Sequence, residues 1–286
     1  MKKVAFFFSG FIPIIAAIFV QFLATFFMIG IGGLFLFPAS PSMRNSGSNL
    51  STLMDLLSNS DFNACIMIIY SITCIVIFGL YYYRYLGGIY LPKASLTFHP
   101  MQFVGIVVLV PGTQFFCSYL IAFVSALFPD WLRRYEELIE QAGLTSDISA
   151  LMLCYSVILA PICEELIFRG VTLRLFRQAL PFWLANLFQA LLFGLFHMNW
   201  IQGIYAFAFG LLLGFVCEKG GSIYYSLLFH VLFNLWGTVI SQLFESTEDT
   251  ILSAVLMLLT TVASLAVGTL LFVLGMKRKE KKRNGI

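Results

Sequence analysis

The sequence predicts an all-α fold, a polytopic transmembrane bundle of about eight helices. Of the 286 residues, 60% are hydrophobic and only 11% are charged, whereas soluble domains carry about 25% charged residues. The apolar residues run in long stretches, each near the roughly 20 residues that a helical span needs. Polar residues gather in short segments between these stretches. This composition leaves too little polar surface for a water-soluble globule, and no nucleic-acid partner is expected.

The expected spans form one transmembrane domain covering residues 1–286. The first and fourth are longer than a perpendicular helix needs, so we expect them to be tilted, to be kinked or to project out of the bilayer. Gly203, Gly210 and Gly214 lie along the sixth, where small residues allow another helix to approach closely. The eight spans are Val4–Phe37, Asn63–Tyr83, Gln102–Phe128, Ile148–Arg177, Phe182–Asn199, Ile201–Cys217, Ile223–Phe244 and Ile251–Met276.

Two polar segments outside the spans have recognisable character. Ser40–Asp61 is rich in Ser, Asn and Pro and is expected to be an exposed loop. Trp131–Gln141 has apolar residues at helical spacing, which predicts a short interfacial helix.

The distribution of basic residues predicts the orientation in the membrane. An even number of spans places both termini on one side, and that side then holds most of the Lys and Arg residues. The positive-inside rule therefore predicts cytoplasmic termini, and the short loops and composition favour a bacterial cell membrane. The basic residues on that side are Lys2, Lys3, Arg84, Lys93, Arg174, Arg177, Lys219 and the tail Lys277–Arg283, against Arg44, Arg133 and Arg134 on the other.

The fourth span carries charges that are costly inside a bilayer, in the sequence PICEELIFRG from Pro161. Charged groups inside a bilayer need partners of opposite charge or have a functional role. Glu165 and Arg169 are four residues apart and are expected to pair on one helix face. Glu164 points about 100° away and is free to face another element. Pro161 removes a helical hydrogen bond and can bend the helix just before the glutamates.

Two further spans carry histidines at helical spacing from another polar or aromatic residue. Phe193 and His197 share a face of the fifth span, and His230 and Asn234 share a face of the seventh. Each residue alone is as often structural as functional. Their joint occurrence on nearby spans predicts one cavity that receives Glu164, His197, His230 and Asn234.

A carboxylate with two imidazoles can activate water, and imidazole or amide groups can donate hydrogen bonds to an oxyanion. That is the chemistry of peptide hydrolysis without a covalent nucleophile. The alternative is a zinc shell formed by Glu164, His197 and His230, because two His and one Glu match catalytic zinc in type and number. The residues alone do not choose between these two.

Three motifs in this order, EELIFR, FGLFH and HVLFN, resemble those of the CPBP family. This family comprises CAAX prenyl endopeptidases and bacteriocin-processing or immunity proteins, and is also described as Abi-like intramembrane proteases. The resemblance covers Ile148 to Ser241, residues 148–241, which we take as the catalytic core.

The resemblance implies a role for each residue of the motifs. Glu164 would be the catalytic base that acts on water, and His197 would assist at the water or metal site. His230 and Asn234 would stabilise the oxyanion. Supporting and positioning roles fall to Glu165, Arg169 and Phe193.

We therefore expect an intramembrane endopeptidase that cuts a peptide bond of a membrane-associated substrate. Its partners would be the lipid bilayer and a peptide or membrane protein, either prenylated or a leader or bacteriocin peptide. The glutamate-dependent, metal-free mechanism is favoured over the metalloprotease one, so no cofactor is expected, with zinc as the alternative. Two other functions remain open, a non-catalytic bacteriocin-immunity or binding protein and a proton-coupled transporter; the absence of visible repeats counts against the transporter.

Overall fold

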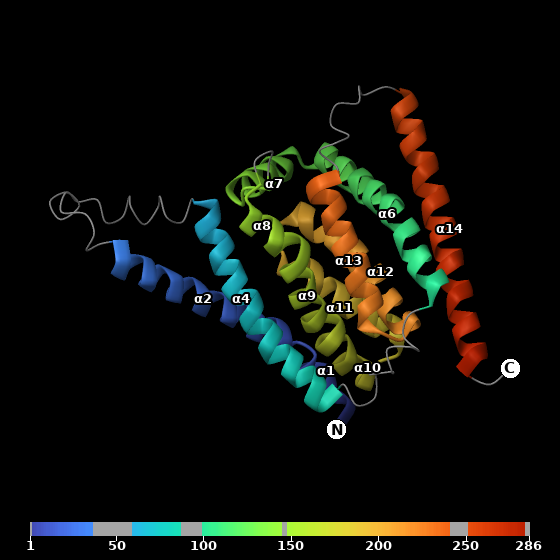
Figure 1. The fold of residues 1–286 in the computed structure, drawn as a ribbon, viewed down its shortest axis with the longest axis horizontal. Coiled ribbons are helices and arrows are strands. Elements are labelled where there is room, and N and C mark those ends of the chain that lie inside the picture. The colour runs from blue at the N-terminus through green and yellow to red at the C-terminus, as the bar shows by residue number, and fades with distance from the viewer. Residues whose placement is uncertain (1, 37–58, 87–98, 145–147, 241–250, 284–286) are drawn as a thin grey trace.

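The computed structural model describes residues 2–36, 59–86, 99–144, 148–240 and 251–283. The regular elements within these ranges are all helices, which confirms the predicted all-α fold (Figure 1). The helices are α1 (Lys2–Ser9), α2 (Ile12–Leu36), α4 (Ser60–Tyr81), α6 (Pro100–Leu127), α7 (Pro129–Gln141), α8 (Ala150–Cys154), α9 (Ala160–Glu165), α10 (Leu173–Ala179), α11 (Phe182–Phe196), α12 (Trp200–Gly220), α13 (Ile223–Leu235) and α14 (Ile251–Arg283), with π-helical turns at Tyr82–Leu86, Tyr155–Leu159, Leu166–Thr172 and Trp236–Ile240.

Within the described ranges, seven helical stretches are long and apolar enough to cross a membrane. The protein is therefore an integral membrane protein. The remaining expected span, the fifth, is shorter than predicted, because α11 ends at Phe196 and not at Asn199. Its 15 residues extend about 22 Å, less than the roughly 30 Å of a bilayer core. The helix stops where Met198 adopts a left-handed conformation with φ 54°, which a helix cannot continue.

The start of α1 and the end of α14 lie on the same, lower side of the bundle in Figure 1. This agrees with an even number of passes, and which side faces the cytoplasm stays a prediction. Some residues used for that prediction, including Arg44 and Lys93, lie outside the described ranges, as does the expected loop up to residue 58.

The two long spans depart from a regular α-helix in different ways. The first breaks between α1 and α2 at Gly10, where a Cβ would collide with the ring of Phe176 on α10. The fourth is a single rod, Ala150–Ala179, in which two π-helical turns flank α9. Figure 1 shows this rod in the middle of the bundle, with α4 on one side and α11 and α13 on the other. The charged residues of the fourth span are therefore enclosed by helices.

The α11–α12 hairpin is packed through its glycines, as the sequence predicts. A Cβ on Gly194 would collide with the carbonyl oxygen of Gly203, and one on Gly210 would press on Ala190 and Phe193. Backbone contact at this distance holds α12 against the face of α11 that carries site residues.

The predicted interfacial helix is α7, and it lies at the upper end of the bundle (Figure 1). The ring of Trp131 stacks on that of Trp200 with centroids 5.6 Å apart. The hydroxyls of Tyr135 and Tyr205 lie 3.5 Å apart, and burial raises the pKa of the Tyr135 phenol above its ordinary value. Aromatic contacts thus attach α7 to α12.

Candidate active site

The predicted ion pair of the fourth span is present and fully enclosed. Nη1 of Arg169 donates to Oε1 of Glu165 at 2.9 Å, and the two side chains are 0% and 1% exposed. Nη2 of Arg169 donates to the carbonyl oxygen of Gly210 at 3.3 Å. Its guanidinium carbon lies 4.4 Å from the ring centroid of Phe193. Because a charge buried without partners is very costly, these contacts are what allow Arg169 and Glu165 to remain in the core.

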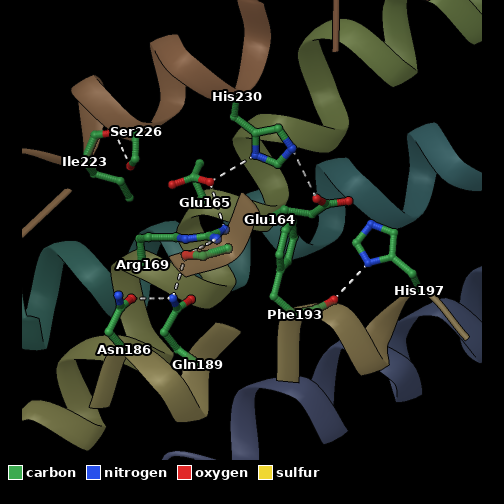
Figure 2. A network of polar contacts seen from close by, with 11 residues as sticks. Glu164, Glu165, Arg169, Asn186, Gln189, Phe193, His197, Ile223, Ser226 and His230 are labelled. Carbon is green, nitrogen blue, oxygen red and sulfur yellow. Dashed lines mark hydrogen bonds and ion pairs between the residues drawn. The ribbon is translucent and has the colours of Figure 1, made fainter. Parts of the chain in front are cut away.

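The imidazole of His230 lies between the two glutamates, as Figure 2 shows. Its Nδ1 is 3.0 Å from Oε1 of Glu165, and its Nε2 is 3.6 Å from Oε2 of Glu164. The imidazole of His230 is therefore within reach of both carboxylates. Two carboxylates and the guanidinium of Arg169 sum to one negative charge while His230 is neutral.

The two neighbouring glutamates differ in their access to solvent. The side chain of Glu164 is 14% exposed, whereas that of Glu165 is 1% exposed. This follows from the helix, since adjacent residues point about 100° apart. Glu164 therefore keeps an accessible surface, whereas Glu165 is closed off.

His197 caps the carboxyl end of α11 beside the same cluster. Its Nδ1 lies 2.8 Å from the carbonyl oxygen of Phe193, and because a carbonyl only accepts, Nδ1 carries the proton. In the neutral ring Nε2 is then an acceptor. The ring centroid of Phe193 is 5.0 Å from that of His197 and 5.8 Å from that of His230. Figure 2 shows the carboxylate of Glu164 between the two imidazoles.

Asn234 reaches the helix that carries the glutamates and not the glutamates themselves. Its Nδ2 donates to the carbonyl oxygen of Ser156 at 2.8 Å. In this π-helical turn the N–H of Ala160 bonds to the carbonyl of Tyr155, five residues back. The next residue, Pro161, has no N–H to offer to Ser156. Asn234 supplies the missing donor, and its role toward an oxyanion stays a prediction that would use its second N–H.

Two buried amides that the sequence reasoning missed complete the support of the ion pair. Nε2 of Gln189 donates at 2.9 Å to the carbonyl oxygen of Gly210, which Arg169 also contacts. Nδ2 of Asn186 donates to the carbonyl oxygen of Leu211 at 3.0 Å. These bonds hold the backbone of α12 at Gly210 and Leu211 in place beside the guanidinium of Arg169.

A signal for these amides exists in the sequence. They are polar residues inside an otherwise apolar span, which marks them as needing partners. Gln189 also lies four residues before Phe193 and eight before His197, on the same helix face.

The donor geometry tests the zinc alternative. His230 Nε2 and Glu164 Oε2 are 3.6 Å apart, close to the roughly 3.4 Å between two ligands of a tetrahedral zinc with bonds near 2.1 Å. Among the described residues, however, no group of three or more His, Cys, Asp or Glu side chains is placed to hold a metal ion. The residues of the expected shell thus provide two donors at ligand spacing but do not assemble a three-ligand site.

The bundle thus brings a partly exposed carboxylate and two imidazoles together among helices that are long and apolar enough to cross a membrane. Residues 146–236 match the family model described as Type II CAAX prenyl endopeptidase Rce1-like. The matched segment includes all three motifs, which confirms the resemblance to the CPBP family over these residues. Neither a curated protein nor a solved structure matches the chain.

Proposed function

We propose that this protein is an intramembrane endopeptidase in which Glu164 activates the water that cuts the peptide bond. The observation that supports this most is the asymmetry of the glutamate pair. Oε1 of Glu165 is held by both Arg169 and His230, while Glu164 keeps 14% of its side chain exposed and faces His230 Nε2. One carboxylate holds the structure, and the other is available for chemistry.

The proposed reaction begins with a water molecule held between the Glu164 carboxylate and Nε2 of His197. Glu164 takes a proton from this water as its oxygen attacks the carbonyl carbon of the scissile bond. The resulting tetrahedral intermediate carries an oxyanion, which the protonated His230 and the second N–H of Asn234 stabilise. Glu164 then gives this proton to the amide nitrogen, the C–N bond breaks, and the products are an amine and a carboxylic acid, whose remaining proton passes to the amine, so that an ammonium and a carboxylate leave.

The buried groups around this set have a positioning role in the proposal. Glu165 accepts from His230 Nδ1, which aims Nε2 at the reaction centre and stabilises the protonated ring. Arg169 holds Glu165 ionised, and Phe193 packs between the imidazoles. No metal takes part in this mechanism.

The substrate class follows from the location of the site within the bundle and from the family. We propose a peptide or membrane protein that reaches the site from the bilayer, either a prenylated tail or a leader or bacteriocin peptide. The orientation proposed with it has both termini in the cytoplasm.

The test compares membrane fractions from cells that express the wild type or Glu164→Ala. New protein N-termini are identified by mass spectrometry in each, with expression matched by immunoblot. Peptides cut only in wild-type cells are expected and would name the substrate. Identical cleavage patterns in both would reject the proposal, and full protection against a bacteriocin by Glu164→Ala would favour the non-catalytic immunity function.

A further inference from the structure

The last helix of the bundle continues past its apolar part into a basic segment. α14 is one helix from Ile251 to Arg283, and its 33 residues extend about 50 Å. The hydrocarbon core of a bilayer is only about 30 Å thick, so α14 is long enough to carry its carboxyl end beyond the core. Six of its last seven residues, KRKEKKR from Lys277, are Lys or Arg. This segment, residues 277–283, is called the basic end of α14 below.

The basic end begins close to the part of α14 that is suited to face lipid tails. Leu270 and Leu274 are exposed apolar residues of this helix, and Lys277 follows Leu274 by three residues, about 4.5 Å along the axis. Lys277 and Arg278 are exposed. The ion pairs among the side chains that the structure describes involve neither of them. Both cations therefore lie where lipid tails give way to headgroups, and both are available to a ligand.

The distribution of charge over the bundle supports an anionic partner at this side. Figure 1 shows the start of α1 and the end of α14 on the same lower side, and α1 begins with the exposed cations Lys2 and Lys3. At the upper end, α7 instead carries four carboxylates and two arginines. Among the described helices, positive charge is thus concentrated at the side where α14 ends.

From these observations we propose that the basic end of α14 binds the headgroups of anionic phospholipids, with Lys277 and Arg278 in direct contact with them. A cluster of four to eight cations directly beyond a transmembrane helix is typical of such binding, and each cation near an anionic surface contributes a factor of about five in affinity. Cations also stabilise the carboxyl end of a helix through its dipole, but that effect is confined to the last turn, whereas the basic end covers nearly two. The proposal concerns lipid binding and does not depend on whether the protein cuts peptides.

The test measures which lipid the protein prefers. The purified full-length chain is reconstituted in phosphatidylcholine vesicles, and the association of spin-labelled phosphatidylglycerol and spin-labelled phosphatidylcholine with the protein is compared by electron spin resonance. The wild type is expected to associate with phosphatidylglycerol about fivefold more strongly. Equal association of the two lipids would overturn the proposal.

A double variant locates the preference on α14. Lys277→Gln/Arg278→Gln removes the two exposed cations and is expected to lower the preference for phosphatidylglycerol at least about twofold. The matched control, Arg133→Gln/Arg134→Gln, removes two exposed arginines from α7 at the upper end and is expected to keep the wild-type preference. An unchanged preference in the α14 variant, or an equal loss in both variants, would show that the basic end is not the binding surface.

A second measurement needs no variant, in case the α14 variant does not fold. Raising sodium chloride to about 1 M shortens the Debye length to about 3 Å and screens exposed charges, so the wild type should lose its preference for phosphatidylglycerol. A preference that the salt leaves unchanged would also overturn the proposal. If soluble polyphosphate binds the wild type while phosphatidylglycerol is not preferred, the cations serve a soluble polyanion and the lipid proposal is wrong.

Discussion

Nδ1 of His230 lies 3.0 Å from Oε1 of Glu165, the same oxygen that Arg169 contacts at 2.9 Å. One carboxylate oxygen therefore ties α13 to the rod that carries both glutamates. It also fixes the imidazole so that Nε2 faces Glu164. The chemistry proposed for Glu164 depends on this support. Substitution of each glutamate separately can distinguish the structural role of Glu165 from the catalytic role of Glu164.

Loss of the buried ion pair should destabilise the fold. Arg169→Met leaves Glu165 buried without its cation and is expected to cost about 3–5 kcal/mol. Unfolding in detergent, followed by circular dichroism, measures the loss. Arg133→Gln breaks an exposed pair with Asp130 and serves as the control, with stability close to that of the wild type. An Arg169→Met protein as stable as this control would show that the pair does not hold the core.

The hydrogen bond from Asn234 to the carbonyl oxygen of Ser156 is expected to stabilise the fold, because Pro161 has no N–H to donate to this carbonyl. Asn234→Ala should cost about 1–2 kcal/mol of stability. In a Pro161→Ala background the backbone can supply the missing donor, so the same change should cost about 1 kcal/mol less. A double-mutant cycle measures this coupling, and strictly additive losses would refute the explanation given for Asn234.

The close packing of α11 on α12 predicts the effect of a single methyl group. A Cβ on Gly214 would collide with the side-chain amides of Asn186 and Gln189, so Gly214→Ala should cost about 1–3 kcal/mol. Gly30 on α2 has no atom near its would-be Cβ, and Gly30→Ala should be neutral or slightly stabilising. Equal Tm values for the two variants would argue against the described α11–α12 interface.

The proposed mechanism predicts that cleavage does not need a metal. Pre-incubation of the purified enzyme with EDTA or 1,10-phenanthroline should leave the rate of substrate cleavage unchanged. Loss of activity with the chelator, and its return with added zinc, would instead support the shell of Glu164, His197 and His230. Elemental analysis of the active protein provides an independent check.

Local relationships in this protein were predictable, and those between distant helices were less so. The Glu165–Arg169 pair follows from four-residue spacing within one helix. Its contact with His230 joins residues 65 positions apart and depends on how α13 packs, which hydropathy does not specify. The motif pattern therefore predicts a shared site without assigning the partner of each imidazole nitrogen.

Two features of the structure that the sequence did not predict have identifiable physical causes. The fifth span was predicted to reach Asn199, whereas the backbone turns at Met198 and the helix ends at Phe196. One N–H of Asn234 serves the carbonyl that Pro161 leaves without a donor, a contact that the sequence did not predict, and its role toward an oxyanion stays a prediction. The second effect requires knowledge of the π-helical turn and is not visible in residue spacing alone.

The most direct test of the division between the glutamates compares Glu164→Gln and Glu165→Gln as purified proteins in liposomes. Thermal unfolding and the rate of cleavage of the identified substrate are measured on each. Glu164→Gln should unfold near the wild-type temperature and lose at least about 100-fold in cleavage rate, whereas Glu165→Gln should unfold at a clearly lower temperature. Cleavage by Glu164→Gln at the wild-type rate would contradict the assignment of Glu164 as the residue that activates water.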